Sequence, residues 1–413
     1  MAKEEVITGL DIGSTNIRVV VGQKNAPNDK LHILGVGEVP TEGVNKGNVT
    51  SIEDAVSSIS SALEKAERMT GIPIENAYVS INGSHIISQE GHGVIAVAKA
   101  DGEIKEEDVE RAIEAAQTVA TPPNYEILHV IPRSFVVDNQ RGVKDPVGMS
   151  GLRLEVNAQI IQGLTSQIKN LTKCVYRTGV DINDLVLSIL ASSEAVLTKR
   201  QKELGVALVN IGGATTSIMV FEEGDVMHTK VLPIGAGHIT NDIAIGLRTS
   251  IDIAEKVKLE YGNCLVDEID KRDEVDLAAV DPSEDTRVSR KHVSEIIEAR
   301  LEEILKLVNN ELEKIERSGL LPAGIVITGG GAKLPGLIEF AKRSFRLPAS
   351  FGLPKDIISA IDRVNDPSFS TAVGLALWGA NLKSEKKGMT LPSFSSINQV
   401  TGRMKKWFQS LMP

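Results

Sequence analysis

Two short segments of the chain combine the residue types that bind phosphate groups. They read "ITGLDIGSTNIRVVV" (residues 7–21) and "ALVNIGGATTSIMVF" (residues 207–221), and each is typical of a strand, a glycine turn and a second strand. In such turns backbone N–H groups converge with hydroxyl donors on an oxyanion such as a nucleotide phosphate. The candidate phosphate-binding residues are Asp11, Gly13, Ser14, Thr15, Asn16, Asn210, Gly212, Gly213, Ala214, Thr215 and Thr216.

The two segments align on a shared Ile-Gly, which places Asp11 opposite Asn210. A hairpin repeated at an offset of about half the chain predicts two similar lobes that face each other across a bound nucleotide. The Asp11 carboxylate can orient the water shell of a Mg²⁺ ion between the phosphates, so Asp11 is also the candidate metal residue. The chain lacks the pattern GxxxxGK[ST], which excludes a P-loop protein.

A third glycine segment, "VITGGGAKLPGL", follows a predicted buried strand. Glycine lets a flat ring approach the backbone closely, so Gly329, Gly330 and Gly331 are candidates for an adenine or ribose site. Glu255 and Lys258 lie one helical turn apart in "DIAEKVKLEYG" and can reach ribose hydroxyls and the base. A surface ion pair between positions i and i+3 explains the same two residues, and the spacing alone does not decide between them.

Composition limits the class of protein. A chain of 413 residues is too long for one simple core, so two or more lobes are expected. A formal net charge of -10 argues against a general nucleic-acid binder. The two cysteines, Cys174 and Cys264, lack metal-ligand spacing and indicate reduced thiols. The start "MAKEEVITGL" lacks the pattern of a secretory signal, so we expect a cytoplasmic protein.

Helical and strand periodicities divide the chain into two lobes with two insertions, a duplicated α/β fold. A small α+β insertion contains the predicted helix "KEEDVERAIEAAQTVA", and a later one contains an acidic stretch followed by a long helix from Ser289. We interpret the apolar stripe of that long helix as core packing. The expected division is residues 1–84, 163–203 and 363–382 for the first lobe (1A), 85–162 for the first insertion (1C), 204–224 and 319–362 for the second lobe (2A), 225–318 for the second insertion (2B), 383–396 for a linker and 397–413 for a terminal helix.

Taken together, these segments resemble the nucleotide-binding signature of the actin, Hsp70 and sugar-kinase superfamily. The two phosphate motifs resemble the two hairpins, and the adenosine motif resembles residues 328–333, which adds Lys333 to the candidate nucleotide-binding residues. The connecting helices resemble "LASSEAVL" and "TAVGLALW". The segments "GLDIGSTNIRVVVG", "YVSINGSHI", "HTKVLPIGAGHITNDIA", "AEKVKLEYG" and "VITGGGAKLPGL" narrow the resemblance to the bacterial cell-division family FtsA, over about residues 5–382.

The resemblance implies an actin-like fold with ATP and Mg²⁺ between two halves, and filament contacts made by the first insertion. Members of this family tether the FtsZ ring to the inner membrane, self-associate into filaments and recruit later division proteins. They bind the C-terminal tail of FtsZ through the second insertion, where Arg290, Lys291 and Arg300 are our candidates for contact with an acidic peptide. A solvated helix face explains each of these cations equally well.

The second hairpin departs from the family pattern, which begins with Asp and carries three glycines. Here Asn210 and Ala214 take those places. An amide keeps the size of the carboxylate but supplies no negative charge to a hydrated divalent ion. We therefore expect nucleotide binding with weak Mg²⁺ coupling, and slow or absent turnover.

The end of the chain has the pattern of a membrane-surface helix. After the polar stretch "KSEKKGMTLPSFSSINQV", the segment "INQVTGRMKKWFQSLMP" places apolar residues on one side and cations on the other. Such a helix inserts its apolar face among anionic lipids; the alternative is docking on the body or on a partner. The candidate membrane residues are Met404, Lys405, Lys406, Trp407, Phe408 and Leu411.

Two other functions remain open at this point. A related actin-like module of a pilus or secretion platform shares the body plan but needs no membrane helix of its own. A small-molecule kinase requires a further catalytic carboxylate, for which the sequence offers no motif.

Overall fold

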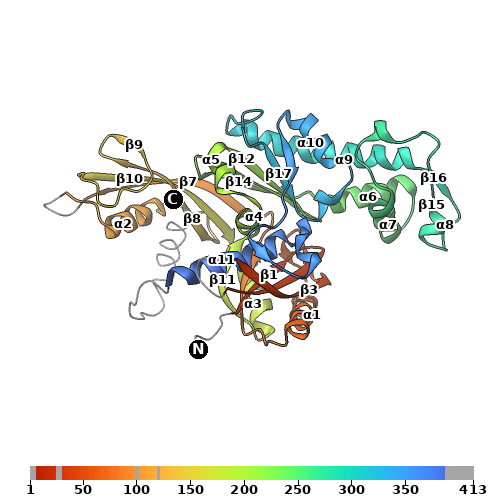
Figure 1. The fold of residues 1–413 in the computed structure, drawn as a ribbon, viewed down its shortest axis with the longest axis horizontal. Coiled ribbons are helices and arrows are strands. Elements are labelled where there is room, and N and C mark those ends of the chain that lie inside the picture. Colours follow the sequence, from red (N-terminus) through yellow and green to blue (C-terminus); the bar gives the residue numbers. More distant parts are fainter. Residues whose placement is uncertain (1–5, 25–29, 98–101, 119–120, 387–413) are drawn as a thin grey trace.

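The computed structural model describes residues 6–24, 30–97, 102–118 and 121–386. These residues form two lobes side by side, with an insertion at each end of the molecule (Figure 1). None of the helices within these ranges is long and apolar enough to cross a membrane. The expected terminal helix, and with it Met404 to Leu411, lies outside the described residues.

The sheet of the first lobe has the order β11-β6-β1-β2-β3-β19. Its strands β1, β2 and β3 form an antiparallel meander, whereas β6 pairs parallel with β1 and β11 pairs parallel with β6. Helices α1, α3, α4 and α11 share a buried core with these strands. The bounds are β1 Val6–Ile12, β2 Asn16–Gln23, β3 Leu31–Pro40, β6 Asn76–Ile81, β11 Asp181–Leu187, β19 Ile357–Ile358, α1 Ile52–Thr70, α3 Thr165–Arg177, α4 Ser188–Val196 and α11 Ser370–Lys386.

The sheet of the second lobe repeats this order of strands. Its strand order β14-β13-β12-β17-β18 matches the order β3-β2-β1-β6-β11 of the first lobe, with the same antiparallel and parallel pairings. The predicted duplication is therefore confirmed at the level of topology. The bounds are β12 Val206–Ile211, β13 Thr216–Glu222, β14 Asp225–Leu232, β17 Ile325–Thr328, β18 Ala349–Phe351, α5 Lys199–Leu204 and α10 Leu337–Phe345.

The first insertion is a separate four-stranded antiparallel sheet, β7-β10-β8-β9, covered by α2. It has a hydrophobic core of its own, which includes Val109, Phe135, Leu154 and Ile160. A segment that buries its own core can be inserted into a lobe without interrupting the lobe's packing. The bounds are β7 Ile86–Ala96, α2 Glu106–Ala116, β8 Tyr125–Val137, β9 Gln140–Val143 and β10 Arg153–Leu164.

The second insertion is mostly helical. The helix expected from Ser289 is α9, for which the Ser289 side chain caps the N-terminus by accepting from the backbone N–H of His292. Its apolar stripe is buried in one core with the second lobe, which confirms the interpretation as core packing. The bounds are α6 Ala236–Leu247, α7 Ile251–Tyr261, β15 Glu274–Asp276, α8 Leu277–Val280, β16 Arg287–Ser289 and α9 Arg290–Lys314.

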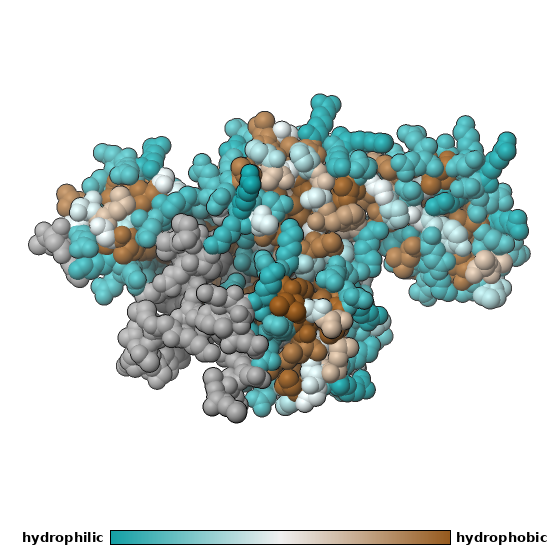
Figure 2. Space-filling view, viewed as in Figure 1, coloured by the Kyte–Doolittle hydropathy of each residue, from teal (hydrophilic) through white to brown (hydrophobic). Residues whose placement is uncertain are grey.

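The linker expected from residue 383 begins differently in the structure, because α11 continues to Lys386. The residues Lys383, Glu385 and Lys386 are good helix formers, which favours continuation of the helix into the expected linker. Figure 2 shows that the outer parts of this face, over the two insertions, are mostly hydrophilic, whereas hydrophobic residues gather over the two lobes.

Candidate functional site

A cavity of about 430 Å³ opens between the two lobes, at the turns of the two predicted phosphate hairpins. Its wall combines three of the predicted segments with the pair on α7. The predicted residues that line it are Thr15, Asn16, Gly213, Glu255, Lys258, Gly330, Gly331 and Lys333. The volume lies in the usual range of small-molecule sites.

The two hairpin turns have the same local geometry and touch each other. Gly13 donates its N–H to the carbonyl of Asn16 at 3.2 Å, and Gly212 donates to the carbonyl of Thr215 at 2.9 Å. A Cβ atom on Gly213 would lie 2.3 Å from Cγ2 of Thr15, so only glycine permits this approach. The two turns therefore form one continuous wall of backbone at the cavity.

The other hairpin residues lie behind this wall. Ser14 Oγ accepts from the N–H of Gly47 at 3.1 Å, and Thr216 Oγ1 donates to the carbonyl of Ile234 at 2.8 Å. Thr215 is buried, and its Oγ1 accepts from Nδ2 of Asn82 at 3.1 Å. These hydroxyls thus brace the turns, and of the predicted hydroxyl side chains it is Thr15 that lines the cavity.

Asp11 is buried at the end of β1 and does not line the cavity. Its Oδ1 accepts a hydrogen bond from Ser80 Oγ at 2.8 Å. Burial raises the pKa of this carboxyl, although the Ser80 hydrogen bond and the charge of Arg18 act in the opposite direction. Among the described residues no group of three or more His, Cys, Asp or Glu side chains is placed to hold a metal ion.

Asn210 faces away from the cavity, toward the crossing of α4 and α11. Its Nδ2 donates to Ser192 Oγ at 3.3 Å and to Thr371 Oγ1 at 3.4 Å, and these two hydroxyls lie 2.9 Å apart. Its Oδ1 lies so close to Gly329 that a Cβ there would be at 2.2 Å. The amide is therefore a donor to the two helices that connect the lobes.

The glycine segment has one residue with open space in front of it. Gly329 has a φ of 88°, and Gly331 packs on Ile211, but no atom lies within 4 Å of a Cβ built on Gly330. Lys333 forms an ion pair with Asp366 at 2.6 Å. An open glycine backbone at the cavity is the feature that a flat ring requires.

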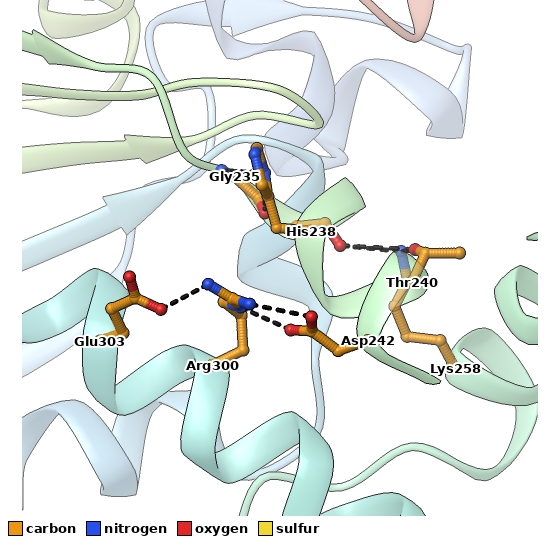
Figure 3. A network of polar contacts seen from close by, with 8 residues as sticks. Gly235, His238, Thr240, Asp242, Lys258, Arg300 and Glu303 are labelled. Carbon is orange, nitrogen blue, oxygen red and sulfur yellow. Dashed lines mark hydrogen bonds and ion pairs between the residues drawn. The ribbon is translucent and has the colours of Figure 1, made fainter. Parts of the chain in front are cut away.

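Glu255 and Lys258 form the ion pair that one of the two readings of the sequence expected, at 2.6 Å, but they form it at the cavity. The Lys258 side chain is only 7% exposed, and its Nζ also donates to Thr240 Oγ1 at 2.8 Å (Figure 3). The two side chains therefore line the cavity, as a ribose or base contact requires, but they are also paired with each other.

Sequence reasoning missed a charged cluster on the first-lobe side of the cavity. Arg18 pairs with Glu38 at 2.8 Å, Arg363 lies 3.7 Å from the same carboxylate, and Arg18 stacks over Phe369 with 5.4 Å to the ring centroid. Arg18 follows Asn16 by two residues on β2 and so faces the same side, a signal that strand alternation offered. Glu38, Arg363 and Phe369 reach the cavity from distant parts of the chain and carry no local signal.

Two of the three cations that were predicted to contact another protein already form ion pairs within the chain. Arg300 pairs with Asp242 at 2.5 Å and with Glu303 (Figure 3), and Arg290 lies 3.4 Å from Asp273. Hydrogen bonding to Asp242 raises the pKa of Arg300. Lys291 is partly exposed on the same helix, α9.

Known proteins resemble the chain over nearly its whole length. The family model "Cell division protein FtsA" matches residues 207–374, and the model "SHS2 domain inserted in FTSA" matches residues 83–162. Proteins named cell division protein FtsA are 39% identical in Pseudomonas aeruginosa (98% of both chains) and 40% identical in Bacillus subtilis (95% of this chain, 88% of that one).

Solved structures share the fold at low identity. The PilM–PilN type IV pilus biogenesis complex has a TM-score of 0.67 at 16% identity and covers 91% of this chain and 98% of that one. MreB5 of Spiroplasma citri bound to AMPPNP has a TM-score of 0.55 at 14% identity and covers 94% and 100%. These likenesses confirm the actin-like two-lobed fold.

The buried Asp11 gives a prediction on stability. Its folded-state pKa is raised, so the associated stability is present at low pH and is lost as the pH rises through that value. Asp11→Asn removes the charge, and without nucleotide or divalent ions we expect a higher melting temperature than wild type at about pH 7.5. The gain should shrink as the pH falls toward 3.8, the ordinary pKa of an aspartic acid, as calorimetry can show. Asp267→Asn, at an exposed position, is the control; a gain independent of pH would contradict the prediction.

Proposed function

The chain belongs to the FtsA family of cell division proteins, and on this premise we propose that it binds ATP between its lobes and links the FtsZ ring to the inner membrane as a structural adaptor. The observation that carries the nucleotide part is the cavity itself, which is lined by both hairpins and by the glycine segment. A duplicated cradle with a glycine wall suits a nucleotide better than a small apolar ligand, because it places glycine backbone and polar side chains such as Thr15 and Lys258 beside apolar ones such as Leu259 and Phe369.

The positions of the glycines support a proposal for where the phosphates and the base of the nucleotide would lie. The turns around Gly13 and Gly213 would hold the phosphates, together with the Thr15 hydroxyl. The open backbone of Gly330 would lie against the base, with Glu255 and Lys258 toward the ribose. A bound Mg²⁺ would neutralise phosphate charge, and Asp11 would contact it through water, since its carboxylate lies behind the turn.

Gly330→Leu offers a direct test of the nucleotide site. The new side chain enters open space and leaves the packing of the lobes intact, but it occupies the proposed base position. We expect ATP and ADP affinity, measured by titration calorimetry, to fall by at least about tenfold, or ~1.4 kcal/mol. Glu107→Leu, which introduces the same side chain at an exposed position of α2 in the first insertion, is the control. The proposal fails if the wild type binds neither nucleotide at millimolar concentration.

We further propose that hydrolysis is slow or absent because Asn210 supplies no charge to the metal. Its amide donates to Ser192 and Thr371, an arrangement that a carboxylate reverses by accepting from the same hydroxyls. Of these two hydroxyls, that of Thr371 can turn its hydrogen to the carboxylate, whereas that of Ser192 donates to the Ser188 carbonyl at 2.8 Å and would have to give up that bond.

Asn210→Asp should accordingly raise the rate of phosphate release. One restored charged contact is worth on the order of 1.5–3 kcal/mol, which predicts at least about a tenfold increase. A malachite green assay with ATP and Mg²⁺ measures it, and Asn210→Ala controls for simple loosening. A wild type that already turns over briskly, with no further gain in the Asp variant, would refute this part.

The tail of FtsZ is the proposed acidic partner of the second insertion. Arg290, Lys291 and Arg300 lie along α9, and Arg300 joins α9 to α6 through Asp242. Ile245, on α6 one turn beyond Asp242, is 76% exposed, so cationic and apolar groups share this region. An acidic peptide with apolar side chains matches such a surface, although it must compete with the internal partners of Arg290 and Arg300.

Anionic lipid is the proposed partner of the terminal segment, residues 397–413, through its cations and its apolar residues. Self-association into filaments and recruitment of later division proteins complete the proposed role. The pilus alternative is supported by the fold alone, since the PilM–PilN likeness has only 16% identity.

One reconstitution tests both attachments. The protein, ATP and vesicles containing anionic lipid are centrifuged with a fluorescent FtsZ tail peptide. Deletion of residues 403–413 should abolish sedimentation of the protein but not peptide binding in solution, whereas Lys291→Glu should weaken peptide binding by several-fold and leave sedimentation unchanged. Sedimentation that survives the deletion would refute the membrane part, and unchanged peptide affinity in the Lys291 variant would refute the placement of the peptide.

A further inference from the structure

The connector between β6 and β7, residues 82–85, contacts the second phosphate hairpin and lies beside the first. Asn82 follows the last residue of β6 and belongs to the first lobe, and β7 is the first strand of the inserted sheet. The carboxyl end of β6 lies beside that of β1, because the two strands run parallel, and this places the connector next to Asp11 and the first hairpin. It therefore joins the surroundings of the phosphate hairpins to the entry of the first insertion.

Asn82 bridges the lobes with both atoms of its amide. Nδ2 donates to Thr215 Oγ1 at 3.1 Å, and Oδ1 accepts from Ser217 Oγ at 3.2 Å. Ser217 is almost fully buried on β13, directly after the second hairpin. The bond from Asn82 occupies an acceptor position of the Thr215 oxygen, so the hydroxyl hydrogen has to point elsewhere.

The connector is packed tightly on its first-lobe side. A Cβ on Gly47 would lie 2.3 Å from the Asn82 carbonyl, and one on Gly83 would lie 2.6 Å from Nδ1 of His85. His85 is buried, and burial lowers its pKa to about 4, so its ring packs there as a neutral group. Gly47 also donates to Ser14 Oγ of the first hairpin. A displacement of Asn82 therefore shifts a packed unit rather than one side chain.

The first insertion is also attached to the opposite end of β13. Lys144, directly after β9, donates to the carbonyl of Glu223 at 2.9 Å and pairs with Asp225 at 2.5 Å, in the turn from β13 to β14. The strands β7 and β8 contact β14 itself. A single strand of the second lobe, β13, thus carries the Asn82 contact at its start and the Lys144 contact at its end.

We propose that Asn82 is a positioning residue of the nucleotide site, which holds the turn of the second hairpin against the first lobe through Thr215 and Ser217 and so couples nucleotide occupancy to the attachment of the first insertion on the second lobe. The inference rests on the proposed function, since it requires a nucleotide in the cavity. A phosphate held by the backbone of both turns joins the lobes at the same place where the two Asn82 hydrogen bonds join them. The nucleotide and Asn82 therefore favour the same relative position of the lobes, and each strengthens the effect of the other.

Hydrogen exchange of the full chain, with and without saturating ATP, tests this coupling. In the wild type we expect ATP to slow exchange in the cavity and also at residues 83–86 and 140–148, which lie at the two attachments. Asn82→Ala should weaken ATP binding by about fivefold and abolish the protection at residues 140–148 even at saturation. Thr215→Val, which is nearly isosteric, should abolish the same protection if the Ala variant does not fold.

Asn76→Ala is the matched control, because Asn76 lies on the same strand, is exposed, and accepts a side-chain bond from Asn183. It should retain the wild-type protection pattern. Protection of residues 140–148 in the Asn82 variant, or its absence in a wild type that binds ATP, would overturn the coupling alone. A wild type that shows no ATP binding in the accompanying titration would overturn the proposed function as well.

Discussion

The contact between the two hairpin turns is the constraint on which the rest of the structure depends. Each turn ends an antiparallel strand pair in its own sheet, and the two sheets have the same order of strands, so the turns meet by symmetry. The meeting leaves no room for a side chain at Gly213, which faces Thr15. The carbonyls of Gly212 and Gly213 accept from Ala236 and Gly237 at the start of α6, which ties the same turn to the second insertion. The cavity beside these turns lies between the lobes, so its width is set by how the lobes are held.

The crossing of α4 and α11 is what holds them. A Cβ on Gly374 would lie 1.9 Å from the carbonyl of Ala191, so the helices touch through backbone atoms. Ser192 and Thr371 are hydrogen-bonded at this crossing, and the Asn210 amide joins them from the end of β12. Asn210 therefore contributes to the connection between the two lobes through its hydrogen bonds. An amide donates where a carboxylate accepts, so the residue type at this position sets the direction of the hydrogen bonds at the crossing.

Local sequence signals predicted the elements and the backbone of the site, and they failed where distant segments meet. The hairpins, the helix capped by Ser289 and the glycine segment were predicted because each is encoded by neighbouring residues. The cluster of Arg18, Glu38 and Arg363 depends on the packing of β2 against β3 and on the segment before α11, which no local pattern specifies. The cations on α9 were recognisable as charges, but their partners on α6 and in the acidic stretch were not.

Charge pairing inside the cavity decides how a nucleotide can be held there. Its cations lie next to carboxylates: Lys258 pairs with Glu255, Lys333 with Asp366 and Arg18 with Glu38. A triphosphate entering the site must either separate these pairs or bind to uncharged donors, and separating a partly buried pair leaves a carboxylate without its partner. Backbone N–H groups and hydroxyls of the hairpins avoid this cost, and they act only when both turns are close together. We infer that phosphate binding at this site would depend on the relative position of the lobes more than on the side-chain cations.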